Sequence, residues 1–341
     1  MNKKSLLGFV LACVCGILPL SLMSMPSSHN LTAGLIGDVD GNGTVDINDL
    51  NVVINAILGQ DVGYQVDVDG NGVVDIEDLN VVINGILGRQ PSVPDGSKTY
   101  TVNGVSFTMV RVDGGTFSMG ATAEQGSSCQ DDEYPVHQVT LSDYSIGATE
   151  VTQELWVAVM GSNPSAFCSA ANFNYSDNFQ RPVERVAWSD CQNFLAKLNE
   201  LTGETFRLPT EAEWEFAARG GNKSKGYMFA GSNNVDEVAW YLGSIPSSQA
   251  FTEGYGTQPV ATKAPNELGL YDMSGNVWEW CNDYYGYYNG AAQTNPTGPA
   301  TGSWHVYRGG GWSNSDPLRC RVARRARSST SLMDLGLRLA Q

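Results

Sequence analysis

The stretch that decides the fold of this chain reads Gly269-Leu-Tyr-Asp-Met-Ser-Gly-Asn-Val-Trp-Glu-Trp-Cys281. It places two tryptophans, two glycines and two carboxylates in one short segment without proline, and Asp272 and Glu279 are its only charged residues. Calcium prefers carboxylate and carbonyl oxygens that converge on one point, and a glycine-containing loop between two acidic residues can supply both. The stretch therefore predicts either a calcium site or a structural turn whose tryptophans fill the core.

The stretch also resembles the GLY-(N/D)-x-x-GN-x-WEW signature of formylglycine-generating enzymes, also called sulfatase-modifying factors. Other segments match that family in the same order and extend the resemblance over residues 99–341; they are Phe107–Gly120, Phe206–Arg219, Arg308–Trp312 and Gly336–Ala340. The resemblance implies an α+β domain, the loop-rich sulfatase-modifying-factor fold, which is related to C-type lectins.

The resemblance also implies a calcium site in the signature loop. Its ligands fall on the side chains of Asp272 and Glu279 and on the main-chain carbonyls of Gly275 and Val277. The family's other calcium site has no matching residues in register around Val238-Ala-Trp240, so only the first site is predicted.

The copper chemistry of the family does not carry over. Its oxidases hold copper with two thiolates in the pattern GG-S-(Y/W)-x-C-x4-C. Counted from Gly309-Gly310, the serine is replaced by Gly311, the first cysteine by Asn314 and the second by Arg319, while Cys320 comes one residue late. An amide and a cation cannot replace two soft thiolates as ligands for Cu(I). We therefore expect no catalytic residues and no copper, with oxidation of a sulfatase cysteine through a variant site as the alternative.

A repeat with a period of 29 residues precedes this domain. Asp38-Val-Asp-Gly-Asn-Gly-Thr-Val-Asp-Ile-Asn-Asp49 recurs as Asp67-Val-Asp-Gly-Asn-Gly-Val-Val-Asp-Ile-Glu-Asp78. Acidic or amide residues at positions 1, 3, 5, 9 and 12, with glycine at position 6, follow the EF-hand ligand order. Each loop leads into an apolar stripe typical of a short helix, which begins at Leu50 or Leu79.

Two loop–helix units without an entering helix resemble the dockerin module, a small all-α, EF-hand-type module that binds cohesin-bearing partners. The resemblance places calcium ligands at Asp38, Asp40, Asn42, Thr44, Asp46 and Asp49, and at Asp67, Asp69, Asn71, Val73, Asp75 and Asp78. Partner recognition would use loop positions 10 and 11, where Ile47-Asn48 and Ile76-Glu77 replace the common Ser-Thr. Calcium is expected all the same, and the replaced positions leave open a partner other than a standard cohesin, or none.

The segments around these modules predict an exported chain. Residues 1–24 have two lysines followed by an apolar run and small residues, which is typical of a signal peptide; a membrane anchor or a lipid anchor is the alternative. We expect the dockerin-like module over residues 30–89, a Pro- and Ser-containing linker over 90–98, and the large domain over 99–341. The net charge of −16 argues against nucleic acid as a partner.

Five cysteines follow the predicted signal peptide. The family brings the segments of Cys281 and Cys320 together, so the resemblance implies a Cys281–Cys320 disulfide. We also expect a Cys129–Cys168 disulfide. Cys191 lies on the apolar face of a predicted helix that starts at Trp188, and is expected to be a free, buried thiol.

Aromatic and basic residues gather near the expected ligand site. The aromatic ones are Tyr284, Tyr285, Tyr287, Tyr288, Trp304, Tyr307 and Trp312, and the basic ones are Arg319, Arg321, Arg324, Arg325 and Arg327. The rings can bind a glycan or a peptide, or pack against their own loops. The arginines can hold carboxylate or sulfate groups, or form internal ion pairs.

Overall fold

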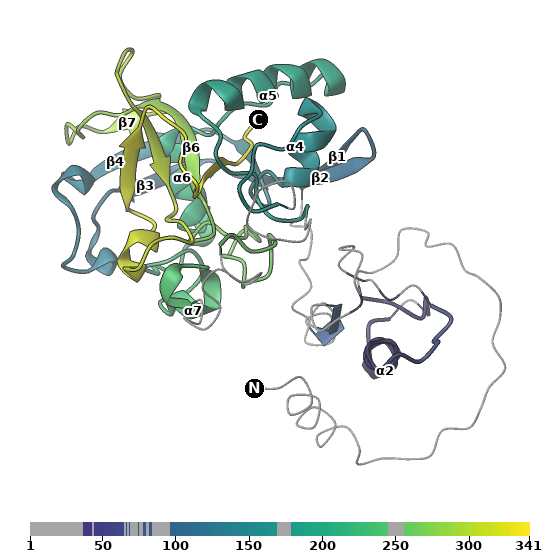
Figure 1. Cartoon of the computed structure of the whole chain (residues 1–341). Helices are drawn as coiled ribbons and strands as arrows, with labels where there is room; N and C mark the ends of the chain where they lie inside the picture. Colours follow the sequence, from purple (N-terminus) through teal and green to yellow (C-terminus); the bar gives the residue numbers. More distant parts are fainter. Residues whose placement is uncertain are drawn as a thin grey trace. The chain divides into compact units, whose positions relative to one another are not determined.

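The computed structural model of the chain describes residues 37–42, 44–64, 66, 68, 74, 78–79, 82–83, 96–168, 179–244 and 256–341. The chain divides into two compact units, Met1–Gln90 and Pro91–Gln341 (Figure 1). The predicted signal peptide lies outside the described residues. Within the described ranges, every helix is too short or too polar to cross a membrane.

The small unit is built on helix α2, Ile47–Ile57. Asp46 is its N-cap, and Asp49 completes a capping box by accepting a hydrogen bond from the backbone of Asp46. The predicted apolar stripe is confirmed, because Leu50, Val53 and Ile54 are buried. Leu79 and Val82 of the second repeat pack in the same cluster, and residues 78–79 and 82–83 are helical. The two repeats therefore share one small core.

The large unit is an α+β structure made of short elements. Its strands are β1 (Lys98–Val102), β2 (Val105–Val112), β3 (Gly115–Met119), β4 (His137–Leu141), β5 (Tyr144–Gly147), β6 (Trp278–Tyr284), β7 (Gln293–Thr294), β8 (His305–Arg308), β9 (Arg325–Ser328) and β10 (Leu335–Leu337). Its α-helices are α4 (Gln153–Met160), α5 (Trp188–Thr202), α6 (Glu211–Ala218) and α7 (Val235–Val238). Single 3-10 turns are η1 (Ala123–Gln125), η2 (Asp131–Glu133), η3 (Gly221–Lys223), η4 (Leu242–Ser244) and η6 (Pro317–Cys320).

Three small sheets hold these strands together. Their strand orders are β1-β2-β5, β3-β4-β7 and β10-β6-β8-β9. The hairpin β1–β2 places Val102 opposite Val105 across the two-residue turn Asn103-Gly104. The four-stranded sheet places the tryptophan stretch on β6, between β8 and the parallel C-terminal strand β10.

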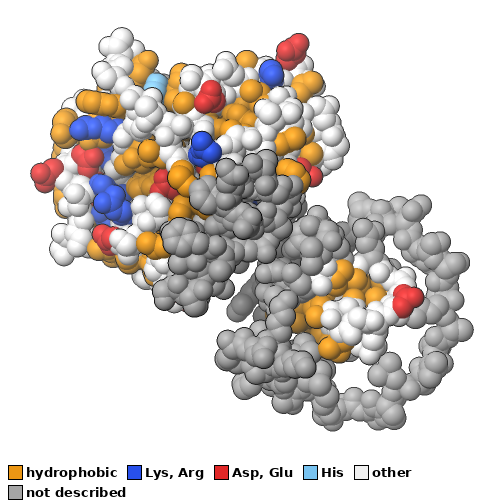
Figure 2. Space-filling view, viewed as in Figure 1, with side chains coloured by type: hydrophobic (Ala, Val, Ile, Leu, Met, Phe, Trp, Pro, Cys, Tyr) orange, Lys and Arg blue, Asp and Glu red, His pale blue; other side chains and the backbone are white. Residues whose placement is uncertain are grey.

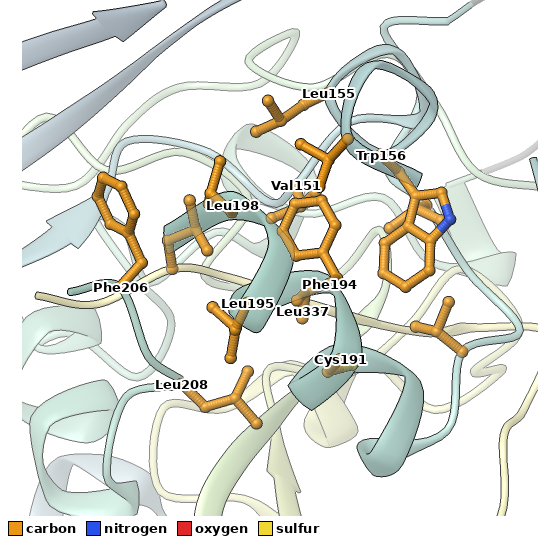
Figure 3. Close-up of a cluster of buried hydrophobic side chains, with 14 of the residues drawn as sticks. Val151, Leu155, Trp156, Cys191, Phe194, Leu195, Leu198, Phe206, Leu208 and Leu337 are labelled. Carbon is orange, nitrogen blue, oxygen red and sulfur yellow. The ribbon is translucent and has the colours of Figure 1, made fainter. Parts of the chain in front are cut away.

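Helices α4 and α5 cover one core of the large unit (Figure 3). Trp156 of α4 stacks on Phe194 of α5, with ring centroids 4.8 Å apart. Cys191, Leu195 and Leu198 of α5 lie in the same cluster, as the helical spacing predicts. The buried thiol of Cys191 is therefore part of this apolar packing.

Helix α6 is buried over most of its surface and lies against β6 and β8. A capping box begins the helix: Glu213 N–H donates to Thr210 Oγ1 at 3.2 Å, and Thr210 N–H donates to Glu213 Oε2 at 2.8 Å. Because the helix is enclosed, Trp214 and Glu215 point into the protein with no exposed surface. The helix thus carries both apolar and charged groups into the centre of the unit.

Candidate functional site

The first repeat loop folds around the carboxylate of Asp49. Its Oδ1 accepts hydrogen bonds from the backbone N–H groups of Val39 and Asp40, at 2.7 and 3.0 Å, and its Oδ2 accepts one from Asp46 at 2.8 Å. Carboxylate oxygens of Asp38, Asp40 and Asp49 lie within 4.8 Å of one another. Burial raises the pKa of Asp40, and the carboxylates of Asp49 and Asp38 raise it further. This donor set fits a divalent cation.

The other predicted positions of this loop shape its turn. Asn42 Oδ1 accepts hydrogen bonds from both the backbone and the hydroxyl of Thr44, at 2.8 and 2.6 Å. The Asp46 carboxylate caps α2 through the Asn48 N–H, at 2.7 Å. Ile47 is 48% exposed and Asn48 is exposed, so the predicted recognition positions face solvent.

The second loop repeats one of these contacts. Val68 N–H donates to Asp78 Oδ1 at 2.5 Å, as Val39 N–H donates to Asp49. Both acceptors are fully buried. The remaining predicted positions lie outside the described residues; they are Asp67, Asp69, Asn71, Val73, Asp75, Ile76 and Glu77.

A second acidic cluster lies under the tryptophan stretch. Asp272 is 2% exposed; its Oδ2 accepts a hydrogen bond from Ala261 N–H at 2.8 Å, and its Oδ1 has no hydrogen-bond partner. Burial raises the pKa of Asp272 to about 6. Gly275 has φ +86°, and a Cβ there would lie 2.5 Å from the carbonyl oxygen of Trp240, so this turn requires glycine.

Glu279 is placed differently from Asp272. Arg338 Nη2 donates to Glu279 Oε1 at 2.7 Å, Arg338 Nε donates to Oε2 at 2.9 Å, and Trp214 Nε1 donates to Oε2 at 2.6 Å. Of the two carboxylates predicted to bind calcium, only Asp272 has an oxygen without a partner. Glu279 also forms a buried ion pair.

Glu150 joins this cluster and was missed from the sequence. It is 1% exposed and accepts hydrogen bonds from Val277 N–H at 2.9 Å and Asn276 Nδ2 at 2.8 Å. Burial, and then the carboxylates of Asp272 and Glu279, raise its pKa well above the ordinary value. Three buried carboxylates thus surround one guanidinium, that of Arg338. A bound cation would offset the excess negative charge.

The segment that begins at Gly309-Gly310-Gly311 contains the positions where the related oxidases have cysteines. Asn314 Oδ1 accepts a hydrogen bond from Gly311 N–H at 3.0 Å, and Arg319 is exposed. Cys320 has no exposed surface, and burial raises the pKa of its thiol to about 12. A Cβ at Gly310 would lie 2.8 Å from Cys320 Sγ, so the thiol packs against backbone.

The predicted disulfides are wrong. All five cysteines of the described residues are free thiols. Cys281 packs in the apolar cluster of Trp214 and Phe216, whereas Cys320 packs in that of Phe229 and Tyr241. Cys129 Sγ instead contacts Arg321 Nη1 at 3.3 Å, and Cys168 Sγ contacts the carbonyl of Ser165 at 3.2 Å. Each thiol is held in a separate environment.

Most arginines of the C-terminal basic cluster form ion pairs. Arg321 binds Glu133 in a bidentate pair at 2.8 Å, Arg325 binds Glu211 at 2.7 Å, and Arg324 lies 3.6 Å from Glu133. Figure 2 shows Lys and Arg side chains close to Asp and Glu on the visible face of the large unit. The ion-pair alternative is therefore confirmed for these three.

Family comparisons cover both units. A sequence model of the sulfatase-modifying factor enzyme 1-like domain matches residues 98–341, and one of the dockerin type I domain matches residues 36–87. The chain is 31% identical over 284 residues to a formylglycine-generating enzyme of Streptomyces coelicolor, covering 68% of this chain and 88% of that protein.

Other relatives carry different names. A protein of Paenibacillus barcinonensis named chaperone protein LppX is 35% identical over 253 residues, covering 62% of this chain and 80% of the relative. The serine/threonine-protein kinase pkn1 of Chlamydia pneumoniae is 34% identical over 256 residues, covering 68% of this chain, and the chain spans only 38% of that kinase.

A solved structure shares the fold. Treponema denticola variable protein 1 superposes with a TM-score of 0.61 at 35% identity, covering 72% of this chain and 98% of that chain. The likeness spans about the length of the large unit, and it agrees with the α+β architecture described above.

Proposed function

The chain belongs to the sulfatase-modifying factor family and carries a dockerin-type segment, and from this premise we propose that its large unit is a calcium-stabilised binding domain without copper oxidase chemistry. The small unit binds calcium and attaches the chain to a cohesin-like partner. The chain is exported, and the large unit binds a glycan or a peptide.

The position of Cys320 carries this proposal. A Cu(I) site of this family needs two thiolates, and the matching positions hold Asn314 and Arg319. Cys320 is buried with a pKa of about 12, so its thiol resists the deprotonation that metal binding requires. The residues present do not fit copper.

The acidic clusters support calcium. In the small unit, the carboxylates of Asp38, Asp40 and Asp49 converge, and the loop from Asp38 to Asp49 contains no basic residue. In the large unit, Asp272 Oδ1 is buried without a partner. Oxygen-rich, negatively charged sites of this kind suit a hard divalent cation. We propose that Asp272 binds calcium together with Glu279 and the carbonyls of Gly275 and Val277.

The exposed first turn of α2 supports partner binding by the small unit. Ile47 offers an exposed apolar side chain beside Asn48. Both positions lie outside the core formed by Leu50, Val53 and Ile54. A cohesin-like surface can contact them without disturbing the calcium loop. The departure from Ser-Thr points to a partner with an apolar contact surface.

Metal analysis tests the proposed loss of copper chemistry. The full chain is incubated with Cu(I) and with calcium, desalted and analysed for both metals, and is assayed aerobically with a Cys-x-Pro-x-Arg peptide. We expect calcium to be retained, copper to be absent and the peptide to be unchanged. Near-stoichiometric copper that is lost in Cys320→Ser, or peptide oxidation that depends on Cys320, would establish the alternative, a variant formylglycine-generating oxidase.

A further inference from the structure

We propose that Arg327, Trp304 and Tyr287 form a binding site for the acidic sugars of an anionic glycan. This inference deepens the proposed binding function of the large unit and rests on it. Arg327 would pair with the carboxylate or sulfate of a sugar, while the two rings pack against sugar faces.

Arg327 differs from its neighbours in having no acidic partner. Among the described residues, no carboxylate lies within ion-pair distance of its guanidinium, and no hydrogen bond holds it. Instead, its guanidinium carbon lies 4.3 Å from the ring centroid of Tyr285 and 4.8 Å from that of Trp304. The side chain is exposed. Its position is therefore set by two aromatic rings, and its N–H groups are available to a ligand.

Hydrogen bonds and the buried side chain of Arg325 hold the backbone that carries these rings. Tyr285 N–H donates to the carbonyl of Trp304 at 2.8 Å. Arg325 Nη1 donates to the carbonyl of Gly286 at 2.9 Å, and its guanidinium lies 4.8 Å from the Tyr285 ring centroid. Arg325 is itself buried and paired with Glu211. Since the supporting residues are held in place, little ordering is needed when a ligand binds.

Two large rings are accessible near Arg327: Trp304 lies against its guanidinium, and the Tyr287 ring lies against that of Tyr285, with ring centroids 6.0 Å apart. Trp304 is 45% exposed and Tyr287 is 73% exposed, although most large apolar side chains of the unit are buried. Exposed Trp and Tyr provide contact area at a low cost in conformational entropy. A guanidinium can make two parallel hydrogen bonds to one carboxylate or sulfate group. Flat apolar faces next to one anion-binding group match an acidic sugar better than a flexible acidic peptide.

The acidic side chain that bonds to Tyr285, that of Asp132, does not form an ion pair with Arg327 among the described residues. Asp132 accepts a hydrogen bond from Tyr285 Oη at 2.8 Å and lies 3.7 Å from Arg324 Nη1. Its charge is thus partly offset by another arginine. The net charge of −16 opposes an anionic ligand at long range, but salt screens charges beyond about 10 Å at 0.1 M ionic strength.

The test measures binding of the full chain to polygalacturonate and to heparin by titration calorimetry, with dextran as a neutral glycan and polyglutamate as an acidic peptide. Arg327→Ala and Trp304→Ala are compared with Arg111→Ala, an exposed arginine that pairs with Asp143 at 2.6 Å on another sheet. Thermal melts confirm that each variant is folded. Arg327→Lys retains the charge but loses the planar guanidinium.

We expect wild-type binding to polygalacturonate, to heparin or to both, weakened roughly tenfold or more in Arg327→Ala and Trp304→Ala. Arg327→Lys should be intermediate and Arg111→Ala unchanged. Binding to one polymer alone identifies carboxylate or sulfate as the group recognised. Wild-type binding absent at about 1 mM sugar, equal affinity for polyglutamate, or unchanged affinity in Arg327→Ala would overturn the inference. The metal analysis above is independent of all these outcomes.

Discussion

Arg338, which directly follows strand β10, binds Glu279 of the adjacent parallel strand β6, and neither side chain has exposed surface. The guanidinium donates to both carboxylate oxygens, and its remaining N–H groups reach the carbonyls of Gly147 and Tyr271 at 2.9 and 2.7 Å. The positive charge of Arg338 therefore offsets the negative charge of Glu279, whereas Glu150 and Asp272 have no buried cation of their own. The next prediction depends on this excess of buried negative charge.

Asp272→Asn should remove the calcium dependence of the large unit's melting temperature. In the wild type, calcium at about 100 times its Kd adds roughly 2.7 kcal/mol, which corresponds to roughly 5–10 °C for a unit of this size. All eight tryptophans lie in the large unit, so tryptophan fluorescence follows its unfolding alone. Melts are recorded with calcium and with a chelator.

Glu184→Gln is the matched control for that experiment. Glu184 is fully buried, its Oε2 has no partner, and burial raises its pKa to about 7. Its Oε1 accepts hydrogen bonds from the backbone of Ala166 and Phe167, which are not among the predicted calcium ligands. This variant should keep the calcium-dependent shift. A chelator-insensitive wild type would contradict the predicted site.

The small unit should lose its calcium sites in the double variant Asp38→Ala and Asp67→Ala. Each change removes the first ligand of a loop, and a unit with a core this small depends on its metal for stability. Titration calorimetry of the full chain should show two fewer sites, and the calcium-dependent rise in helical circular dichroism should disappear. Asp61→Ala, at an exposed position outside both loops, should leave both signals intact.

Stability should fall as the pH rises because of Asp283. Its Oδ2 accepts a hydrogen bond from Glu211 N–H at 2.9 Å, and burial, followed by the charge of Glu211, raises its pKa to about 8 from an ordinary 3.8. Between these two values the folded state binds more protons than the unfolded state, so its stability decreases with pH.

Asp283→Asn tests this pH dependence. The amide oxygen can keep the hydrogen bond from Glu211 without titrating. At about 1.4 kcal/mol per pKa unit, the variant should gain on the order of a few kcal/mol relative to the wild type between pH 5 and 8. Urea unfolding at both pH values measures the difference. The exposed Asp131→Asn should follow the wild type, and parallel profiles for Asp283→Asn would rule out this titration.

Thiol counting should find every cysteine of the large unit reduced. After denaturation without a reductant, a maleimide should label Cys129, Cys168, Cys191, Cys281 and Cys320, because all five are free in the fold. Peptide mapping by mass spectrometry identifies each labelled site. A peptide linking Cys281 to Cys320 would show that the two apolar clusters rearrange, and would restore the disulfide prediction.

Local signals in the sequence predict the regular elements well. Helix α5 covers Trp188–Thr202 and starts at the predicted residue, because its apolar residues recur at helical spacing. The capping box at Thr210 likewise involves residues three apart in the chain. Such patterns depend on neighbours only, so one sequence is enough to recognise them.

The candidate site is harder to predict because its contacts span long stretches of chain. Glu150 bonds to a backbone amide 127 residues away, and Arg338 pairs with Glu279 across 59 residues. A lone glutamate before a helix gives no sign of either contact. The disulfide prediction failed for the same reason: nearness of the Cys281 and Cys320 segments does not determine which apolar cluster each thiol enters.

Arg338 is synthesised later than its partner Glu279, and this delay limits when the large unit can fold. It directly follows strand β10, so the ribosome makes Glu279 59 residues before the guanidinium that pairs with it. At about 5–20 residues per second, this delay lasts roughly 3–12 s. During that time β6 lacks its parallel neighbour β10, and Glu279 lacks the guanidinium that pairs with it in the fold. The sheet that contains Glu279 can therefore close only after Arg338 has been made.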